Sequence, residues 1–250
     1  MPEFTASVVA VTGAASGMGE ATTRLFAEAG ATLALIDRDG DGIHRVAAEV
    51  GGASTHVGDI ADSGFCNATI DAIVEKHGRI DVLVNAAGTI HRADATGTTD
   101  ADWDRVLSVN VSGMFYLSRA AVRHMAPAGS GAIVNFGSIW GGVGSAGSTA
   151  YCVSKGAVHQ LTRAMALDHV EQGIRVNAVA PGEVRTPMLS SQRSTTPTEA
   201  ELQQMADATI PMKRLAEPIE IARVVLFLAS DDASYMTGEI VHVDAGYTAR

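Results

Sequence analysis

The chain contains 250 residues, of which 46% are hydrophobic and 18% are charged, and its formal net charge is -10. This composition is typical of a globular protein, and the length suits one large α/β domain or two small ones. The acidic balance argues against a nucleic-acid partner, because binding to phosphates requires a basic face.

The sequence also lacks the patterns of several other protein classes. No uninterrupted apolar run reaches the length of a membrane span, so we expect no membrane association. The first residues lack a basic region and a cleavage site, which indicates that there is no signal peptide. Cys66 and Cys152 are too few for a disulfide framework, and without a Cys/His cluster we expect no metal site. We therefore predict a cytoplasmic protein with reduced thiols.

The chain opens with the pattern of a nucleotide-binding unit, in which a strand leads through a glycine loop into a helix. Residues 6–11 are apolar and β-branched, and a helical pattern covers residues 20–29. Between them, residues 12–19 read Thr-Gly-Ala-Ala-Ser-Gly-Met-Gly. Glycines in such a loop permit a tight turn and let backbone N–H groups approach a pyrophosphate at the helix N-terminus.

An acidic residue follows the second predicted strand. Residues 32–36 form this buried strand, and Asp37 comes directly after it, near the offset at which an acid binds the adenosine ribose. A carboxylate here repels a 2′-phosphate, so the sequence favours NAD over NADP. Two alternatives stay open: Asp37 caps the next helix, or the neighbouring Arg38 accommodates NADP.

Strands and helices continue to alternate through the middle of the chain. Helical patterns at residues 41–50 and 63–77 flank a short strand at residues 54–57. Asp59 follows this strand, where its carboxylate would either meet an adenine amino group or cap the next helix. Alternation of this kind predicts an α/β fold with a doubly wound parallel sheet, helices on both faces, and ligands at the carboxyl ends of the strands.

The next strand, at residues 80–84, leads into Asn85-Ala-Ala-Gly88. Small side chains at this point allow a flat ring system to lie against the backbone. A long helical pattern then spans residues 100–125, with Asp100 as its candidate N-cap and Asn110 in its middle. An Asn inside a helix is unfavourable. It is either bonded to neighbouring backbone or part of an irregularity that faces the active site.

The stretch from Ser138 to Lys155 is the most informative part of the sequence. A predicted strand at residues 133–136 ends just before Ser138, and a glycine-rich loop then precedes a helical pattern that continues to residue 170. Tyr151 and Lys155 lie one helical turn apart on the same face, and a cation beside a phenol favours the phenolate. Taken alone, the pair also fits an ordinary amphipathic helix with a solvated lysine.

The last part of the chain contains two strands and a long excursion between them. Residues 175–179 and 240–243 have strand patterns, and Pro218 opens a helix that continues to residue 229. The polar segment at residues 183–212 has helical potential near residues 199–207. Because long excursions from compact sheets often close over ligands, we predict that this segment is a substrate lid on a single domain of residues 1–250.

Several of these motifs together resemble the short-chain dehydrogenase/reductase family. They are the glycine loop, Asn85-Ala-Ala-Gly88, Ser138 and Tyr151-x-x-x-Lys155, and Pro181-Gly182 falls where the family has a matching element. The resemblance covers residues 8–246. It implies a single-domain Rossmann fold with a seven-stranded parallel sheet and helices on both faces. The catalytic residues that it implies are Asn110, Ser138, Tyr151 and Lys155.

The same resemblance implies the reaction and the cofactor contacts. A hydride would pass between nicotinamide and a small secondary alcohol or ketone, with Tyr151 as general acid/base and Ser138 bonded to the substrate oxygen. Lys155 would bind the nicotinamide ribose and favour the phenolate, and Asn110 would hold a relay water. The cofactor-binding residues implied are Gly13, Ser16, Gly17, Met18, Gly19, Asp37, Arg38, Asp59, Ile60, Asn85, Ala86, Ala87, Gly88, Tyr151, Lys155, Pro181, Gly182, Val184 and Thr186.

The substrate and the assembly are less constrained. We expect the substrate pocket to include Ser138, Trp140, Tyr151 and Met188. An anionic substrate is a weaker hypothesis, in which the cation is supplied by Arg92, Arg185, Lys213 or Arg214. An NADP-dependent reductase and a catalytically silent dinucleotide sensor are the alternative functions. The family resemblance implies a homotetramer or dimer paired through helices at residues 102–125 and 150–170.

Overall fold

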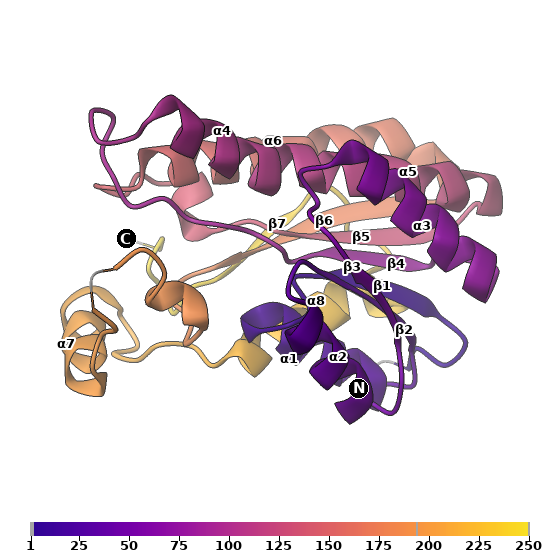
Figure 1. Ribbon diagram of the computed structural model, residues 1–250, viewed down its shortest axis with the longest axis horizontal. Coiled ribbons are helices and arrows are strands. Elements are labelled where there is room, and N and C mark those ends of the chain that lie inside the picture. The colour runs from indigo at the N-terminus through magenta and orange to yellow at the C-terminus, as the bar shows by residue number, and fades with distance from the viewer. Residues whose placement is uncertain (1–2, 194, 250) are drawn as a thin grey trace.

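The computed structural model describes residues 3–193 and 195–249 (Figure 1). Residues 1, 2 and 250 of the predicted domain and residue 194 of the predicted lid lie outside the described residues. Within the described residues, the strands form one parallel sheet in the order β3-β2-β1-β4-β5-β6-β7, which confirms the predicted doubly wound sheet. The strands are β1 (Val8–Thr12), β2 (Thr32–Asp37), β3 (Ser54–Val57), β4 (Val82–Asn85), β5 (Gly131–Phe136), β6 (Ile174–Pro181) and β7 (Ile240–Val243).

Helices cover both faces of the sheet (Figure 1). One layer contains α1 (Gly17–Glu28), α2 (Gly40–Glu49) and α8 (Pro218–Ala229). The opposite layer contains α3 (Ser63–His77), α4 (Asp100–Leu107), the π-helix η1 (Ser108–Gly113), α5 (Met114–Ala128) and α6 (Thr149–His169). The remaining helix, α7 (Glu199–Thr209), lies to one side of the sheet.

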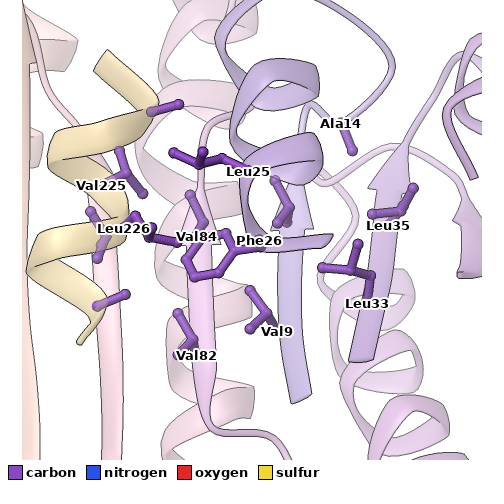
Figure 2. Packing of buried hydrophobic residues seen from close by; sticks show 14 of the residues in the cluster. Val9, Ala14, Leu25, Phe26, Leu33, Leu35, Val82, Val84, Val225 and Leu226 are labelled. Carbon is purple, nitrogen blue, oxygen red and sulfur yellow. The ribbon is translucent and has the colours of Figure 1, made fainter. Parts of the chain in front are cut away.

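The core has two parts, one on each face of the sheet. In β1, Val9 and Val11 pack on the side of α1 and α8, whereas Val8 and Ala10 pack on the side of α3 and α5. Successive strand residues point to opposite faces, so a strand covered on both faces is apolar throughout. Figure 2 shows Phe26 of α1 over the sheet, beside residues of α8. Complete burial of such a side chain contributes about 1.5–3 kcal/mol.

The helix predicted over residues 100–125 is wrong as a single regular element. It consists of α4, η1 and α5, and Thr99 rather than Asp100 is its N-cap, since the Thr99 hydroxyl accepts a hydrogen bond from the Asp102 N–H. The π-helical turn lies close to a neighbouring loop. A Cβ atom at Gly113 would lie 2.8 Å from the backbone oxygen of Ile60, so the helix backbone approaches the loop after β3 closely.

A small hydrophobic cluster lies around α7, within and just after the segment at residues 183–212 that is predicted to be a lid. Helix α7 packs through Leu202 and Ala206 against Ile210 and Leu215. Its N-terminus has a capping box, in which the Thr198 hydroxyl and the side chain of the third helical residue satisfy each other's backbone N–H groups. The segment is therefore held by contacts near α7, and bonds from Arg92 to Met188 and Ser191 join it to the loop after β4.

Three further observations concern the chain as a whole. None of the helices in the described part of the chain has both the length and the apolar character needed to cross a bilayer. The same residues contain no group of three or more His, Cys, Asp and Glu side chains placed to hold a metal ion. Cys66 and Cys152 are free thiols, and burial raises the pKa of the Cys66 thiol to about 12.

Candidate active site

The glycine loop joins β1 to α1 and brings the backbone of three strands together. Gly13 and Gly17 have φ values of 66° and 58°, which favour glycine. A Cβ atom at Gly13 would lie 2.9 Å from the Cα atom of Ala87, and one at Gly19 would lie 2.1 Å from the carbonyl oxygen of Gly13. Ser16 is the N-cap of α1 but makes no capping hydrogen bond. The N–H groups in the first turn of α1 are therefore available to an anionic ligand.

A cavity of about 340 Å³ runs along this loop at the carboxyl ends of the strands. Residues after β1, β2, β3 and β4 line it, which is where ligands bind in a doubly wound sheet. The predicted cofactor-binding residues that line it are Gly13, Ser16, Gly17, Met18, Gly19, Asp37, Arg38, Asp59, Ile60, Ala86, Ala87, Gly88 and Thr186.

Asp37 ends β2 and faces the glycine loop. Its carboxylate accepts hydrogen bonds from the backbone N–H groups of Ala15 and Asp39, both at 3.0 Å. It does not cap the next helix: the N-cap of α2 is Asp39, which accepts from the Gly42 N–H. The carboxylate of Asp37 thus lies beside the phosphate-binding loop, and the exposed Arg38 lines the same cavity.

Asp59 is held by an ion pair that the sequence did not reveal. Its carboxylate accepts from the Ala61 N–H at 3.0 Å and from the Arg105 guanidinium at 2.8 Å. Burial opposes its ionisation, but these hydrogen bonds lower the pKa of Asp59. Asp62, rather than Asp59, caps α3. Arg105 also lines the cavity, so an adenine ring would meet a paired carboxylate with a guanidinium beside it.

Asn85 lies beneath the cavity and does not line it. It is buried, and its amide nitrogen donates to the hydroxyl of Ser118 and to Asn135, both at 2.9 Å. Asn135 donates in turn to Thr162. Of the predicted Asn85 to Gly88 segment, Ala86, Ala87 and Gly88 line the cavity, whereas Asn85 joins β4 to β5 and α5.

Tyr151 and Lys155 are both buried on one face of α6, which excludes the solvated lysine of an ordinary surface helix. The Lys155 Nζ lies 5.6 Å from the centre of the Tyr151 ring and donates to the Phe136 carbonyl oxygen at 2.6 Å. The net effect on the phenol is opposite to the sequence expectation. Burial raises the pKa of Tyr151 to about 12, and hydrogen bonding with Ser138 only partly opposes it. Burial also lowers the pKa of Lys155 to about 8.

Asn110 occupies the π-helix η1, and it is bonded to backbone, which is the first of its two sequence alternatives. It lines neither cavity. Its side-chain oxygen accepts from the Thr89 N–H, and its amide donates to the Thr89 oxygen, both at 2.8 Å. The same amide donates to the Ser154 hydroxyl at 3.0 Å. A Cβ atom at Gly88 would lie 3.3 Å from the Asn110 oxygen and 3.9 Å from the Lys155 Nζ. Asn110 thus joins β4, α6 and the irregular helix next to the buried lysine.

Ser138 and Trp140 lie between β5 and α6. Ser138 caps the short 3-10 helix η2 (Ile139–Gly141), and its hydroxyl accepts from the Trp140 N–H at 3.2 Å. The Trp140 ring meets the Tyr151 ring edge to face, with the centres 6.0 Å apart. This contact fixes the plane of the phenol, so the hydroxyls of Ser138 and Tyr151 share one wall.

A second cavity adjoins the first, because Met18, Thr186 and Met188 line both. It contains every residue of the predicted substrate pocket, namely Ser138, Trp140, Tyr151 and Met188, together with Pro181, Gly182 and Val184 from the predicted cofactor set. Its titratable lining residues are Arg92, Tyr151 and Glu183. The sequence analysis did not single out Glu183 as a cavity residue. The signal that could have identified it is its position directly after Pro181-Gly182.

Only one of the four candidate cations for an anionic substrate lines this cavity. Arg185 pairs with Glu199 and Glu217, and Arg214 pairs with Glu220. Lys213 donates to a backbone carbonyl at the end of α7. Arg92 alone lines the cavity, and it is itself bonded to the carbonyl oxygens of Met188 and Ser191.

The burial of Lys155 predicts a dependence of stability on pH. Its pKa falls from an ordinary 10.5 to about 8, so between these values the unfolded chain carries a proton that the folded chain has released. Stability therefore rises with pH in this window. The quantity to follow is the free energy of unfolding of the unsubstituted protein minus that of Lys155→Met. This difference should increase by about 2 kcal/mol between pH 8 and 10, since one pKa unit is worth about 1.4 kcal/mol.

Urea titrations at intervals of half a pH unit would measure this difference. Lys76→Met is the matched control, because Lys76 is exposed on α3. The control should follow the unsubstituted protein across the whole window. Parallel curves for Lys155→Met and the unsubstituted protein would show that the lysine keeps its proton in the fold.

Comparison with known proteins places the chain among nicotinamide-dependent oxidoreductases. A family model described as Enoyl-(Acyl carrier protein) reductase matches residues 13–248. The chain is 46% identical over 243 residues to a galactitol 2-dehydrogenase (L-tagatose-forming) of Cereibacter sphaeroides, with 96% of this chain and 94% of the relative covered.

Two solved structures are similar over almost the whole length. The crystal structure of levodione reductase has a TM-score of 0.94 at 36% identity and covers 99% of both chains. A 3-ketoacyl-(acyl-carrier-protein) reductase from Brucella melitensis, complexed with NADH, has a TM-score of 0.91 at 33% identity, with 98% of this chain and 99% of that chain covered. With its seven-stranded sheet, glycine loop and buried Tyr151–Lys155 pair, the chain belongs to the short-chain dehydrogenase/reductase family of oxidoreductases.

Proposed function

We propose that the protein is an NAD-dependent dehydrogenase that interconverts a small secondary alcohol and the corresponding ketone. The observation that carries this proposal is the junction of the two cavities. The phosphate-binding loop lines one cavity, and the hydroxyls of Ser138 and Tyr151 line the other. A dinucleotide in the first cavity would end where a substrate in the second begins.

The residues of the first cavity fit a dinucleotide. The close backbone approach leaves no room for a side chain at Gly13 or Gly19, and the main-chain N–H groups of the first turn of α1 would face a pyrophosphate. Asp37 offers acceptors to the ribose hydroxyls, and Ala86 to Gly88 offer a flat surface. When bound, the nicotinamide supplies or accepts the hydride.

The chain's own residues would manage the proton and the substrate oxygen. Tyr151 would hold or remove the proton of the alcohol hydroxyl as a general acid/base. Ser138 would donate a hydrogen bond to the oxygen where negative charge develops. Lys155 would place a positive charge next to the ring of Tyr151. Asn110 holds the backbone of Thr89 through two hydrogen bonds.

The preference for NAD over NADP rests on Asp37. Its carboxylate is already oriented by two backbone N–H groups and would repel a 2′-phosphate. The relative complexed with NADH supports the nicotinamide part of the proposal, and Arg38 in the lining of the same cavity supports NADP as the second candidate.

We further propose that residues 183–212 act as a lid and that the protein is a cytoplasmic homotetramer or dimer. Exposed apolar side chains on α5 and α6, Phe115, Val153 and Leu167, support pairing of these helices. Free thiols at Cys66 and Cys152 suit a reducing compartment. Light scattering that reports a monomer would contradict the assembly, and recovery in an exported fraction would contradict the location.

A screen of secondary alcohols with NAD, followed by the absorbance of NADH, tests the proposed reaction. We expect NADH to form with at least one secondary alcohol and not with the matching tertiary alcohol, which has no hydrogen on its carbinol carbon. Identical traces for secondary and tertiary alcohols would show that no hydride is transferred.

A further inference from the structure

Glu183 is the only carboxylate among the residues lining the second cavity, and its position is set by the backbone on both sides. Its carbonyl oxygen accepts from the Ala216 N–H at 3.0 Å, and Val184 forms a parallel bridge with Ala216. This short pairing holds Glu183 beside Pro181-Gly182, at the carboxyl end of β6. The side chain is therefore placed by a rigid part of the fold.

The Glu183 carboxylate has unmet hydrogen-bonding capacity. Among the described residues, its side chain has neither a hydrogen bond nor an ion pair, although the residue is half-buried. Burial raises the pKa of Glu183, and the positive charges of Arg92 and Arg193 only partly oppose this. A substrate that fills the cavity would displace water from this half-buried carboxylate, so a substrate that brings a hydrogen-bond donor is favoured over one that leaves the carboxylate without a partner.

The neighbouring charges decide which donor suits the cavity. Glu183 and Tyr151 both line the second cavity, so a bound substrate can contact both residues. Arg92 lines that space as well, held by the carbonyl oxygens of Met188 and Ser191. A carboxylate on the substrate would be repelled by Glu183, and an ammonium would be repelled by Arg92. A neutral hydroxyl fits both, because it donates to one and accepts from the other.

We propose that Glu183 is a specificity-determining residue that accepts a hydrogen bond from a second hydroxyl of the substrate, so that the enzyme selects neutral diols or polyols. This inference rests on the proposed function, since the first hydroxyl is the one oxidised beside Tyr151 and Ser138. The similarity to a galactitol dehydrogenase is in keeping with it, but the inference depends on the cavity of this chain.

A series of four alcohols of the form CH₃–CHOH–CH₂–X tests the inference. The group X is OH in 1,2-propanediol, CH₃ in 2-butanol, NH₃⁺ in 1-amino-2-propanol and COO⁻ in 3-hydroxybutyrate, with the carbinol of the same spatial configuration in each. We expect kcat/KM with NAD to be about tenfold or more higher for the diol than for 2-butanol, because hydrogen bonds to charged groups are worth about that factor or more. The hydroxy acid should be the poorest substrate.

Variants assign the preference to Glu183. Glu183→Leu should lower the ratio of diol to 2-butanol about tenfold, mainly through the KM for the diol, and Glu183→Gln should lower it less. Glu199→Gln is the matched control, since Glu199 is exposed on the lid segment, pairs with Arg185 and lines neither cavity. Its ratio should equal that of the unsubstituted protein. NADH binding measured by fluorescence would verify that each variant is folded.

Three outcomes would overturn the inference. Equal kcat/KM for the four alcohols would remove the role of Glu183 and leave the proposed function intact. A preference for the amino alcohol would identify a cation site instead of a hydroxyl site. Absence of NADH formation with all four alcohols would contradict both the inference and the proposed function.

Discussion

Tyr151→Phe should retain NADH binding and lose turnover by about a thousandfold. General acid–base catalysis by a positioned side chain raises the reaction rate about 10²–10⁴-fold. The replacement removes the hydroxyl of Tyr151, which is the only described residue of α6 that lines the second cavity. The ring itself remains, so its edge-to-face contact with Trp140 is preserved. Steady-state kinetics with a secondary alcohol and fluorescence titration with NADH measure the two quantities separately.

Tyr235→Phe is the control for the same chemical change. Tyr235 is fully exposed between α8 and β7, so loss of its hydroxyl should alter neither turnover nor NADH binding. If Tyr151→Phe keeps turnover within a few-fold of the unsubstituted protein, another group moves the proton. The pKa of Tyr151, which burial raises to about 12, then plays no part in the reaction.

Replacement of Asp37 by alanine should shift the cofactor preference from NAD toward NADP by about a hundredfold. The change removes the acceptors for the ribose hydroxyls and also the negative charge that repels a 2′-phosphate. Each hydrogen bond to a charged group is worth about 1.5–3 kcal/mol. Arg38, which lines the same cavity, would then face the phosphate without a neighbouring carboxylate. The ratio of kcat/KM for NAD to that for NADP is the quantity to measure.

Asp41→Ala is the matched control for this replacement. Asp41 is exposed in the first turn of α2 and does not line the cavity. Its replacement by alanine removes the same charge as Asp37→Ala from the same region of the protein. Its cofactor ratio should stay within about twofold of the unsubstituted value, because exposed charges are screened. Equal shifts for Asp37→Ala and Asp41→Ala would mean that net charge, and not the placed carboxylate, sets the preference.

The regular elements were accessible from the sequence where their patterns are local. The helices at residues 63–77 and 218–229 and the strand at residues 240–243 have the bounds that their patterns predict. Most differences elsewhere are of a few residues, as in β1, β4 and β5, because the ends of strands are set by pairing with neighbours. The helix over residues 100–125 is the exception. At its interruption, η1, Asn110 is bonded to the backbone of Thr89, which the local pattern of residues 100–125 does not include.

The candidate site also has features that local sequence predicts and features that depend on the fold. The glycine loop and the Tyr151–Lys155 spacing are local, so the sequence located the loop residues that line the first cavity and Tyr151, which lines the second. Lys155 is buried next to Tyr151 and lines neither cavity. Asn85 was expected directly after a strand and is the last residue of β4, and its side chain turns into the core to meet Ser118 and Asn135. The direction of the side chain depends on which partners the fold brings to it.

The sequence by itself determined the order of strands and helices, the glycine loop and the set of candidate catalytic groups, because each of these depends on residues close together in the chain. Only the tertiary structure decided how those groups are charged and paired. Burial shifts the pKa of Tyr151 up and that of Lys155 down, Arg105 pairs with Asp59, and Glu183 lines the same cavity as Tyr151. The physical reason is that desolvation and ion pairing depend on what surrounds a group in space, which linear spacing does not specify.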